Sequence, residues 1–354
     1  MSIKSILYRL QTKYRDYVDP LFFQMRYAKS TLAKKRNTIT FDKIDNDSIL
    51  KIKNLWGEVN GWFDFYYTIG DKSKVELYFP DDWFFKSIDA NMNDWRICRV
   101  MDDKGMYDLF FYDVNRPRTI ARCCNGIWMN DYYEITDEER VVTSCHELGK
   151  VIIKPSISSC GGHGIVFWQK GQGDLYEKLN SCRNCVVQEI IEQHDDLSSI
   201  HPESINTIRI MTMLYDGEVH ILSSILRMGV GDSKVDNVSS GGIACGIDEQ
   251  GRLKNKAFQA DGRCYDKHPQ GKIFEGLLVP GFESCKTLCR KVAPRFARFS
   301  RLISWDFAID RNAQPLLIEA NLYAGELDFH QMCNGPIFRD EATTKIMIDR
   351  YYKK

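Results

Sequence analysis

The chain has 354 residues, of which 44% are hydrophobic and 27% are charged, so its length suits two or three packed units of an ordinary globular protein. Its 48 basic and 48 acidic residues cancel, which argues against nucleic acid as the main partner, because duplex binding normally requires a basic excess. Apolar runs fall well short of the roughly 20 residues of a membrane span, the N-terminus lacks the apolar core of a secretion signal, and the twelve cysteines fit reduced thiols, so we expect a cytoplasmic protein.

The N-terminal segment is strongly basic. Residues 1–36 carry nine Lys or Arg and two Asp, which gives a net charge of +7. Such a segment suits contact with an anionic membrane surface or a polyanionic substrate, or a solvated helix that caps the next domain. We favour the solvated helix. As far as residue 98 the sequence predicts mostly helix with aromatic packing and shows no chemical motif.

From about residue 99 the pattern predicts alternating helices and strands. Thr136 and Glu139 have the spacing of a capping box, which predicts a helix from 137 to about 147. Asp216-Gly217 between two apolar runs is a strong hairpin signal. The expected strands cover residues 151–153, 165–168, 185–187, 208–214, 219–226, 242–247, 302–309 and 315–321, with a further helix within 282–298.

A lysine and a glycine-rich loop follow the first of these strands. Lys154 ends the strand, and the loop after it contains Ser159, Gly161, Gly162 and Gly164. Glycines let backbone N–H groups approach a phosphate, and a lysine adds a positive charge. The same residues also suit an ordinary hairpin turn, and this segment alone does not decide between the two.

The segment 186–192 ends a strand with alternating apolar and acidic residues. A backbone of this kind can bind an adenine edge while apolar neighbours cover the ring, although a plain edge strand explains the segment as well. Arg209 and Arg227 lie in apolar strands, where a buried arginine requires an anionic partner. That partner is either a structural carboxylate or a bound phosphate. Asn237, shortly before a Gly-Gly pair, adds a polar turn.

The final hairpin brings acidic side chains together. If its turn is centred between residues 312 and 313, residue i pairs with residue 625 − i, and Asp306 lies opposite Glu319. Asn321 then shares the face of Glu319, because side chains alternate along a strand. Two carboxylates facing each other repel unless a cation lies between them, and an oxygen-only ligand set suits Mg²⁺. A solvent-exposed acidic face is the alternative.

The order of these motifs resembles the ATP-grasp superfamily. A strand-end lysine, a glycine loop, a Gln-Glu hinge, paired strand arginines and an Asp…Glu-x-Asn hairpin follow one another. More narrowly, the chain resembles the sugar-transfer-associated ATP-grasp proteins, through stretches such as Asn206-Thr207-Ile208-Arg209, Leu226-Arg227-Met228-Gly229 and Glu319-Ala320-Asn321. The resemblance covers about residues 100–340. It implies an α+β fold in which two subdomains hold ATP between them, preceded by a helical region, with units at 1–98, 99–192 and 193–354.

The resemblance also implies roles for individual residues. Lys104, Lys154 and the loop after Lys154 are expected on the ATP phosphates, and Glu192 is the candidate for the ribose. Arg209 and Arg227 are expected as catalytic contacts to phosphate or acyl phosphate, beside Asn237. The full set expected to bind the nucleotide is Lys104, Lys154, Ser159, Gly161, Gly162, Gly164, Gln188, Glu189, Ile191, Glu192 and Asn237, with Asp306, Glu319 and Asn321 as magnesium ligands.

The implied activity is that of an ADP-forming carboxylate–amine ligase that uses ATP and Mg²⁺. Its partners would be a small molecule or glycan with a carboxylate and an amine acceptor, in polysaccharide or glycoconjugate assembly. A kinase that phosphorylates a hydroxyl is the alternative among enzymes, and a catalytically silent ATP-binding scaffold is the alternative outside them. The intact acidic set and Lys154 disfavour the scaffold.

Overall fold

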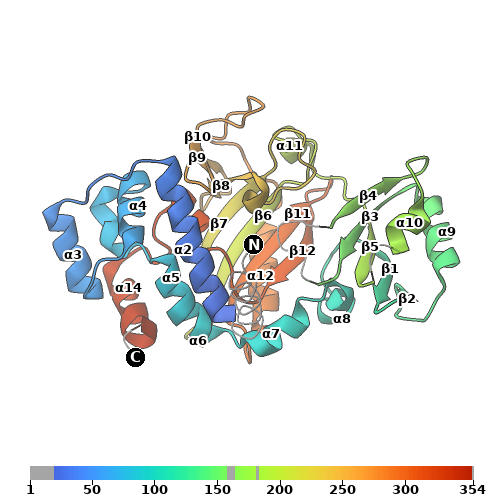
Figure 1. Ribbon diagram of the computed structural model, residues 1–354, viewed down its shortest axis with the longest axis horizontal. Helices are drawn as coiled ribbons and strands as arrows, with labels where there is room; N and C mark the ends of the chain where they lie inside the picture. The colour runs from blue at the N-terminus through green and yellow to red at the C-terminus, as the bar shows by residue number, and fades with distance from the viewer. Residues whose placement is uncertain (1–19, 158–163, 181–182, 353–354) are drawn as a thin grey trace, which may run out of the picture.

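The computed structural model describes residues 20–157, 164–180 and 183–352, which form helices and two antiparallel sheets. Along the longest axis of the molecule, N-terminal helices occupy one end, a seven-stranded sheet the middle and a five-stranded sheet the other end (Figure 1). The expected combination of helix and sheet with a helical N-terminal region is confirmed. The boundaries expected at residues 98 and 192 remain predictions.

The helices lie mainly before the first strand and after the last. The α-helices are α2 (Pro20–Thr38), α3 (Asn46–Trp56), α4 (Gly61–Ile69), α5 (Asp81–Phe84), α6 (Ala90–Met92), α7 (Trp95–Met101), α8 (Tyr107–Phe110), α9 (Glu138–Leu148), α10 (Leu175–Asn180), α11 (Asp195–Ser198), α12 (Phe282–Val292), α13 (Asp328–Asn334) and α14 (Glu341–Met347). Short 3₁₀ turns are η1 (Lys72–Leu77), η3 (Lys104–Met106), η5 (Val238–Ser240) and η6 (Ala293–Phe296), and π-helical turns are η2 (Phe85–Asp89) and η7 (Ile348–Tyr352).

The five-stranded sheet carries the first part of the predicted nucleotide site. Its strand order is β2-β1-β5-β3-β4, with every pair antiparallel. Helices α9 and α10 cover it, and a small separate core fills the space between (Figure 1). The strands are β1 (Thr119–Cys124), β2 (Ile127–Asn130), β3 (Lys150–Pro155), β4 (Val166–Gln169) and β5 (Cys185–Glu189).

The seven-stranded sheet has the order β10-β9-β8-β7-β6-β11-β12. The β6–β7 hairpin turns at Asp216 and Gly217, which both have positive φ (50° and 83°), as the Asp-Gly signal predicts. The last hairpin has the bounds expected from the sequence. The strands are β6 (Thr207–Tyr215), β7 (Glu218–Met228), β8 (Ile243–Ile247), β9 (Leu253–Gln259), β10 (Cys264–Tyr265), β11 (Leu302–Ile309) and β12 (Pro315–Asn321).

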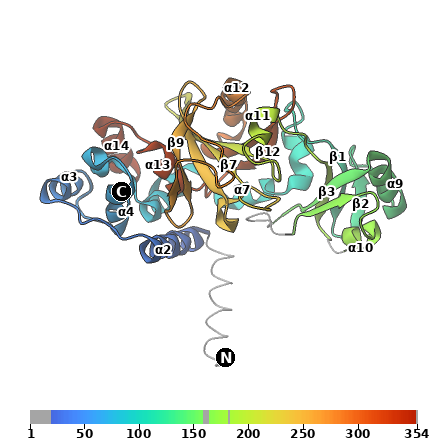
Figure 2. The ribbon, with the colours of Figure 1, turned by 90° about the horizontal axis from the view of Figure 1, so that it is seen from above.

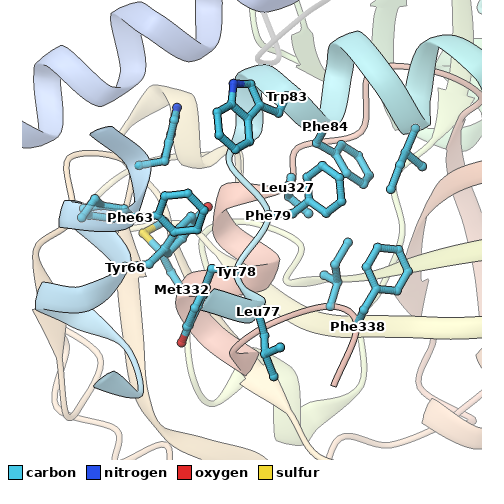
Figure 3. Packing of buried hydrophobic residues seen from close by; sticks show 14 of the residues in the cluster. Phe63, Tyr66, Leu77, Tyr78, Phe79, Trp83, Phe84, Leu327, Met332 and Phe338 are labelled. Atoms are coloured by element: carbon cyan, nitrogen blue, oxygen red, sulfur yellow. The ribbon is translucent and has the colours of Figure 1, made fainter. Parts of the chain in front are cut away.

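Aromatic side chains of the N-terminal region share one core with the end of the chain. Figure 3 shows Phe79 and Trp83 packed beside Leu327, Met332 and Phe338, which follow β12. Methionines on β6 belong to the same core, so this region covers one face of the seven-stranded sheet. Helix α2 runs along that side of the molecule (Figures 1 and 2). The helical region and the C-terminal helices therefore form a single packed unit.

The start of α9 differs from the expectation. Asp137, and not Thr136, caps the helix, because its carboxylate accepts a hydrogen bond from the backbone N–H of Arg140. An Asp side chain one residue after Thr136 can accept hydrogen bonds from the same unpaired N–H groups. The capping-box spacing alone therefore does not identify which of the two residues caps the helix. The helix ends at Gly149, whose φ of 77° is the left-handed conformation that favours glycine.

Two expectations lie partly or wholly outside the described residues. Most of the basic segment 1–36 precedes residue 20, so contact with a membrane remains a prediction. Of the glycine loop, Ser159, Gly161 and Gly162 lie outside the described residues, and Gly164 lies within them. Among the helices in the described part of the chain, none is long and apolar enough to cross a membrane.

Candidate active site

Two lysines approach the acidic hairpin from the five-stranded sheet and from the turn before it. Lys104 begins η3, where its backbone N–H donates to the carbonyl oxygen of Ser156 at the end of β3 (2.8 Å). Its ammonium group lies 2.7 Å from Glu319 Oε1. Lys154 lies on β3 and donates to Gln188 Oε1 (3.1 Å). Burial and the nearby Lys104 lower the pKa of Lys154 to about 8, against the opposing effect of Glu319.

The acidic hairpin has the register deduced from the sequence at Asp306, Glu319 and Asn321. Asp306 pairs with Glu319, and Ser304 pairs with Asn321. A bulge follows Asp306 and moves the pairing of Phe307 to Leu317, so the rule of 625 − i fails toward the turn. The bulge leaves the paired carboxylates on one face.

Asp306 is the buried centre of this face. Arg209 makes a bidentate ion pair with it, since Nε donates to Oδ1 and Nη2 donates to Oδ2, each at 2.7 Å. Arg227 Nη1 also donates to Oδ2 (3.2 Å). Burial opposes ionisation of Asp306, but Arg209 and Arg227 outweigh burial and lower its pKa. Structural carboxylates are therefore partners of both buried arginines.

Several residues predicted to bind adenine and ribose have protein partners. The Gln188 side chain is buried between Lys154 and Thr119, and Glu189 Oε1 accepts from the backbone N–H of Arg118 (2.9 Å). The carboxylate of Glu192 lies 2.9 Å from Lys150 Nζ and 3.3 Å from Arg311 Nη1. Ile191 is half-buried beside it. The nucleotide roles of these residues remain proposals.

At the two polar turns, the described residues show the local geometry. Gly164 has a φ of 78°, and a Cβ there would lie 2.9 Å from Pro155 Cγ, so the end of the loop requires glycine. Asn237 accepts the backbone N–H of Gly242 through its carbonyl oxygen (3.1 Å). Its neighbour Asp236 lies nearer the arginines, with Oδ2 3.5 Å from Arg227 Nε, and also accepts from Thr207 Oγ1.

Three acidic residues of the site were missed by the sequence analysis. Asp236 is one, and Glu326 is another, because it binds Arg209 Nη1 at 2.8 Å. The third is Asp102, which accepts from the Tyr323 hydroxyl (3.0 Å). Burial raises the pKa of Asp102 to about 6, and Glu319 adds to the rise. The arginines at 209 and 227 predicted acidic partners, but nothing in the sequence indicates which distant residues supply them.

Side chains from the N-terminal region hold the segment that follows β12. The carboxylate of Asp89 accepts from the backbone N–H of Ala324 (3.3 and 3.2 Å). Gln331 pairs with both the N–H and the carbonyl oxygen of Phe79 (3.0 and 2.7 Å). The fully buried Lys35 lies 2.9 Å from Asp328. Residues 322–331, including Glu326, are therefore positioned by a region that lies at the other end of the sequence.

The oxygen donors on the hairpin are of the kind that Mg²⁺ prefers, although both carboxylates are ion-paired with Arg209, Arg227 or Lys104 in this structure. Asp306 and Glu319 offer carboxylate oxygens from paired positions, and Asn321 lies beside them with its amide nitrogen 3.4 Å from Asp306 Oδ2. In the described ranges, no group of three His, Cys, Asp or Glu could hold a metal ion. An ion here would complete its coordination with amide, water or phosphate oxygens, as Mg²⁺ commonly does.

Lys154 lies on the five-stranded sheet, Asp306 and Glu319 lie on the seven-stranded sheet, and Lys104 contacts Glu319 from the turn η3. The sequence profile of the sugar-transfer-associated ATP-grasp proteins matches residues 86–346, which is most of the chain. The chain therefore belongs to the sugar-transfer-associated ATP-grasp family, and the fold expected from the resemblance is confirmed.

Solved structures similar to this chain include the biotin carboxylase domain of 2-oxoglutarate carboxylase from Hydrogenobacter thermophilus. It is 15% identical with a TM-score of 0.43, and the match covers 73% of this chain and 47% of that one. D-alanyl-alanine synthetase A from Vibrio cholerae is 11% identical with a TM-score of 0.39, over 70% of this chain and 65% of that one. D-cycloserine synthetase DcsG is 12% identical with a TM-score of 0.41, over 71% of each chain.

The match thus spans about half to two thirds of the length of the first two of these structures. Among curated proteins, none shows a significant sequence match to this chain.

Proposed function

We propose that the protein is an ADP-forming ligase that uses Mg·ATP to join a carboxylate to an amine. The observation that carries this proposal is the ion pair between Lys104 and Glu319, which brings a predicted phosphate lysine against a predicted magnesium ligand (2.7 Å). Lys154, whose pKa is affected by both groups, completes a cluster of two cations and one anion. In such a cluster the two lysines can bind the negative charge of a polyphosphate, and the glutamate can bind its divalent ion.

Each group has a proposed role. Lys104, Lys154 and the glycine loop would bind the phosphates, and Asp306, Glu319 and Asn321 would hold Mg²⁺, which would neutralise charge on the transferred phosphoryl group. The segment 188–192 would bind the base and ribose. Arg209 and Arg227 would contact the acyl phosphate, with Asn237 beside them and with Glu326 balancing the charge of Arg209.

The proposed reaction has two steps. A carboxylate oxygen of the first substrate attacks the γ-phosphorus of ATP, the bond to ADP breaks, and an acyl phosphate forms. An amine then attacks the acyl carbon, phosphate leaves, and the nitrogen gives up a proton to yield the amide. Positioning and electrostatic stabilisation supply most of the catalysis in such transfers, and no protein nucleophile is needed.

The family suggests the setting. We propose that the substrates are a sugar or amino acid carboxylate and an amine, in the assembly of a cell-surface polysaccharide or glycoconjugate, and that the enzyme works in the cytoplasm. The description of the family as sugar-transfer-associated supports this setting.

Nucleotide binding tests the proposal most directly. Thermal unfolding of the wild type should shift upward with Mg·ATP, and much less with ATP in EDTA, because binding to the folded state stabilises it. Glu319→Gln should reduce the magnesium-dependent part of the shift. Glu249→Gln is the matched control, since Glu249 is an exposed glutamate whose ion-pair partner is Arg339.

A wild type that no nucleotide stabilises would contradict the proposal. For the choice between ligase and kinase, the release of ADP is measured with a carboxylate, with and without an amine. A ligase requires both for sustained turnover, whereas a kinase releases ADP with a hydroxyl acceptor alone.

A further inference from the structure

A polar cavity of about 370 Å³ lies apart from the proposed catalytic site, because none of the residues that line it has a role in the proposed reaction. Its walls come from η1 of the N-terminal region, from the β8–β9 hairpin and from the segment that follows α13. Three cations, Lys74, Lys254 and Arg339, face two acids, Asp248 and Glu249, which leaves one net positive charge. The size is that of a small-molecule site, and the charge favours an anion.

Lys254 is the most buried cation of this cavity. It lies on β9 and is partly buried, whereas Lys74 and Arg339 are exposed. Its ammonium group lies 3.5 Å from the backbone carbonyl oxygen of Asn334, which is at the limit of a hydrogen bond. It has no ion-pair partner within the described ranges. Burial lowers the pKa of Lys254, and repulsion from Arg339 adds to this effect.

Two other buried lysines show what this environment means. The ammonium group of Lys35 lies 2.9 Å from the carboxylate of Asp328, which balances its charge. Lys154, in contrast, donates to the uncharged amide of Gln188, and burial lowers its pKa as it does for Lys254. Lys154 is the lysine proposed to bind the ATP phosphates. Lys254 therefore repeats, at a second place, the environment of a lysine that binds an anion.

Gly246 on β8 brings Lys254 and the end of α13 together. A Cβ at this position would lie 2.4 Å from Asn334 Oδ1, 2.7 Å from the carbonyl oxygen of Cys333 and 3.0 Å from Lys254 Cδ. A larger residue would therefore push the stem of Lys254 or the helix end away from the sheet. The Asn334 amide is fixed in turn, because it donates to Ser223 Oγ (2.9 Å). The surrounding packing thus positions Lys254, as a binding site requires.

The two acids that line the cavity have partners other than Lys254. Asp248 Oδ1 accepts a hydrogen bond from the backbone N–H of Gln250 (3.0 Å), so this carboxylate stabilises the turn between β8 and β9. Glu249 pairs with Arg339, and the two side chains are 70% and 68% exposed. An exposed ion pair of this kind contributes little to stability, so the Arg339 guanidinium group can turn toward a bound anion.

The cavity is near the paired arginines of the proposed catalytic site but distinct from them. Gly246 pairs with Ile225, which pairs with Arg209 on the next strand. Two strand spacings of roughly 5 Å each therefore separate Gly246 from Arg209. Helix α13 packs over β7, β8 and β9, and it begins two residues after Glu326. A ligand in the cavity would therefore contact the end of the helix whose start follows Glu326.

We propose that this cavity is a second anion site, in which Lys254, assisted by Lys74 and Arg339, binds the phosphate or carboxylate group of a small organic molecule. The ligand class follows from the three cationic side chains, which match negatively charged oxygens and repel an ammonium group. The volume leaves room for an organic part, and the Gln250 amide and Glu249 offer partners for hydroxyl groups. A hydroxylated oxyanion, such as a sugar phosphate or a sugar acid, fits these features. The inference goes beyond the proposed function, which does not use this cavity.

Isothermal titration of the full-length protein with glucose 6-phosphate and, separately, with glucuronate tests the site. The wild type should bind one of them with a dissociation constant of about 1 mM or lower. Lys254→Met removes the charge at similar length and should weaken this binding about tenfold or more, whereas Lys254→Arg should retain most of it. Lys256→Met, at an exposed lysine of the same strand, is the matched control and should bind as the wild type does.

A second measurement locates the ligand in the wild-type protein and needs no variant. The protein is acetylated with N-acetoxysuccinimide at pH 8, with and without the preferred ligand, and mass spectrometry gives the rate at each lysine. Binding in the cavity should slow the acetylation of Lys254 severalfold and leave that of Lys256 unchanged. Protection of Lys154 in place of Lys254 would show that the anion binds at the nucleotide lysine, and it would overturn the second site.

The titrations separate the remaining outcomes. Preference for glucose 6-phosphate identifies a phosphate group as the ligand, and preference for glucuronate identifies a carboxylate; either result supports the site when it depends on Lys254. Equal binding by the wild type and Lys254→Met overturns the site, as does a wild type that binds neither compound. Protection of Lys254 in a protein that no nucleotide stabilises would support the anion site and contradict the proposed function alone.

Discussion

Asp306 and Glu319 pair across the hairpin but differ in burial and in the number of their cationic partners. The Asp306 side chain is 4% exposed and is held by two buried arginines, whereas Glu319 is 33% exposed and contacts one lysine. Replacing a buried ion-pair partner leaves an uncompensated charge, while replacing a partly exposed partner leaves a charge that water can reach. The two residues should therefore differ in stability effect even if both bind the same ion.

Substitution of each carboxylate by its amide measures this difference. Asp306→Asn should lower the free energy of unfolding by about 3–5 kcal/mol, because Arg209 and Arg227 lose their shared anion. Glu319→Gln should change it by about 1 kcal/mol or less. Urea unfolding at pH 7 without nucleotide gives both values. Equal effects would show that Asp306 is not the structural centre of the arginine pair.

Lys154 should make nucleotide binding depend on pH in a narrow range. Its pKa is lowered from 10.5 to about 8, so its charge is lost in the folded protein as the pH rises through 8. Nucleotide affinity should fall about tenfold between pH 7 and 9.5, because the neutral amine no longer attracts phosphate. Isothermal titration across this range measures the fall.

Lys154→Arg is the matched control for this pH dependence, because arginine stays charged throughout. The free energy of unfolding of the nucleotide-free protein should instead rise with pH. Between pH 8 and 10.5 the unfolded chain keeps the Lys154 proton that the folded protein has lost, so the unfolded state binds more protons and stability rises with pH. A pH-independent affinity in the wild type would contradict the role of Lys154.

At the scale of elements, the segment after β12 is held in place by side-chain contacts from the N-terminal region. Gln331 satisfies both backbone groups of Phe79, and Asp89 accepts from Ala324. Because Glu326 lies between these attachment points, its position against Arg209 depends on them. A substitution at Gln331, remote from the reacting groups, should therefore alter the geometry of the site.

Gln331→Leu tests this dependence. The substitution leaves the N–H and carbonyl oxygen of Phe79 unpaired in a buried setting, which should lower stability by about 2–4 kcal/mol. It should also lower the turnover of the proposed reaction, because Glu326 loses its fixed position against Arg209. Gln250→Leu, on an exposed turn, is the control for the same change of residue type. Stability equal to that of the control would contradict the attachment.

At the scale of the whole molecule, the largest aromatic core is shared between the two ends of the chain. Phe79, Trp83 and Phe84 of the N-terminal region pack against residues beyond β12, among them Leu327 and Phe338 (Figure 3). The five-stranded sheet, in contrast, has a core of its own. The N-terminal helices are thus part of the central unit of the fold.

Removal of residues 1–98 should therefore prevent folding of the seven-stranded unit. The deletion would expose the apolar side chains that follow β12, and the remaining chain should aggregate or lose its near-ultraviolet circular dichroism. Expression of residues 99–354 beside the full chain, with solubility and circular dichroism as readouts, checks this. A soluble, cooperatively unfolding fragment would contradict the shared core.

Local patterns and their spacing could be predicted from the sequence alone. The final hairpin, its pairing of Asp306 with Glu319, the Asp-Gly turn and most strands follow from alternation and turn chemistry, which act between near neighbours. The order of motifs was enough to indicate the family. Such features depend on few residues, so they are visible in one chain.

The contacts between distant groups could not be predicted, because they depend on how the chain folds. Arg209 had to find an anion, but the choice of Asp306 and Glu326 depends on strand order and on a segment fixed by the N-terminal helices. Gln188 binds Lys154, and Asp236, the neighbour of Asn237, contacts Arg227. The contacts of Gln188 and Arg209 join residues 34 to 117 positions apart. Their energies depend on burial, which a linear pattern does not specify.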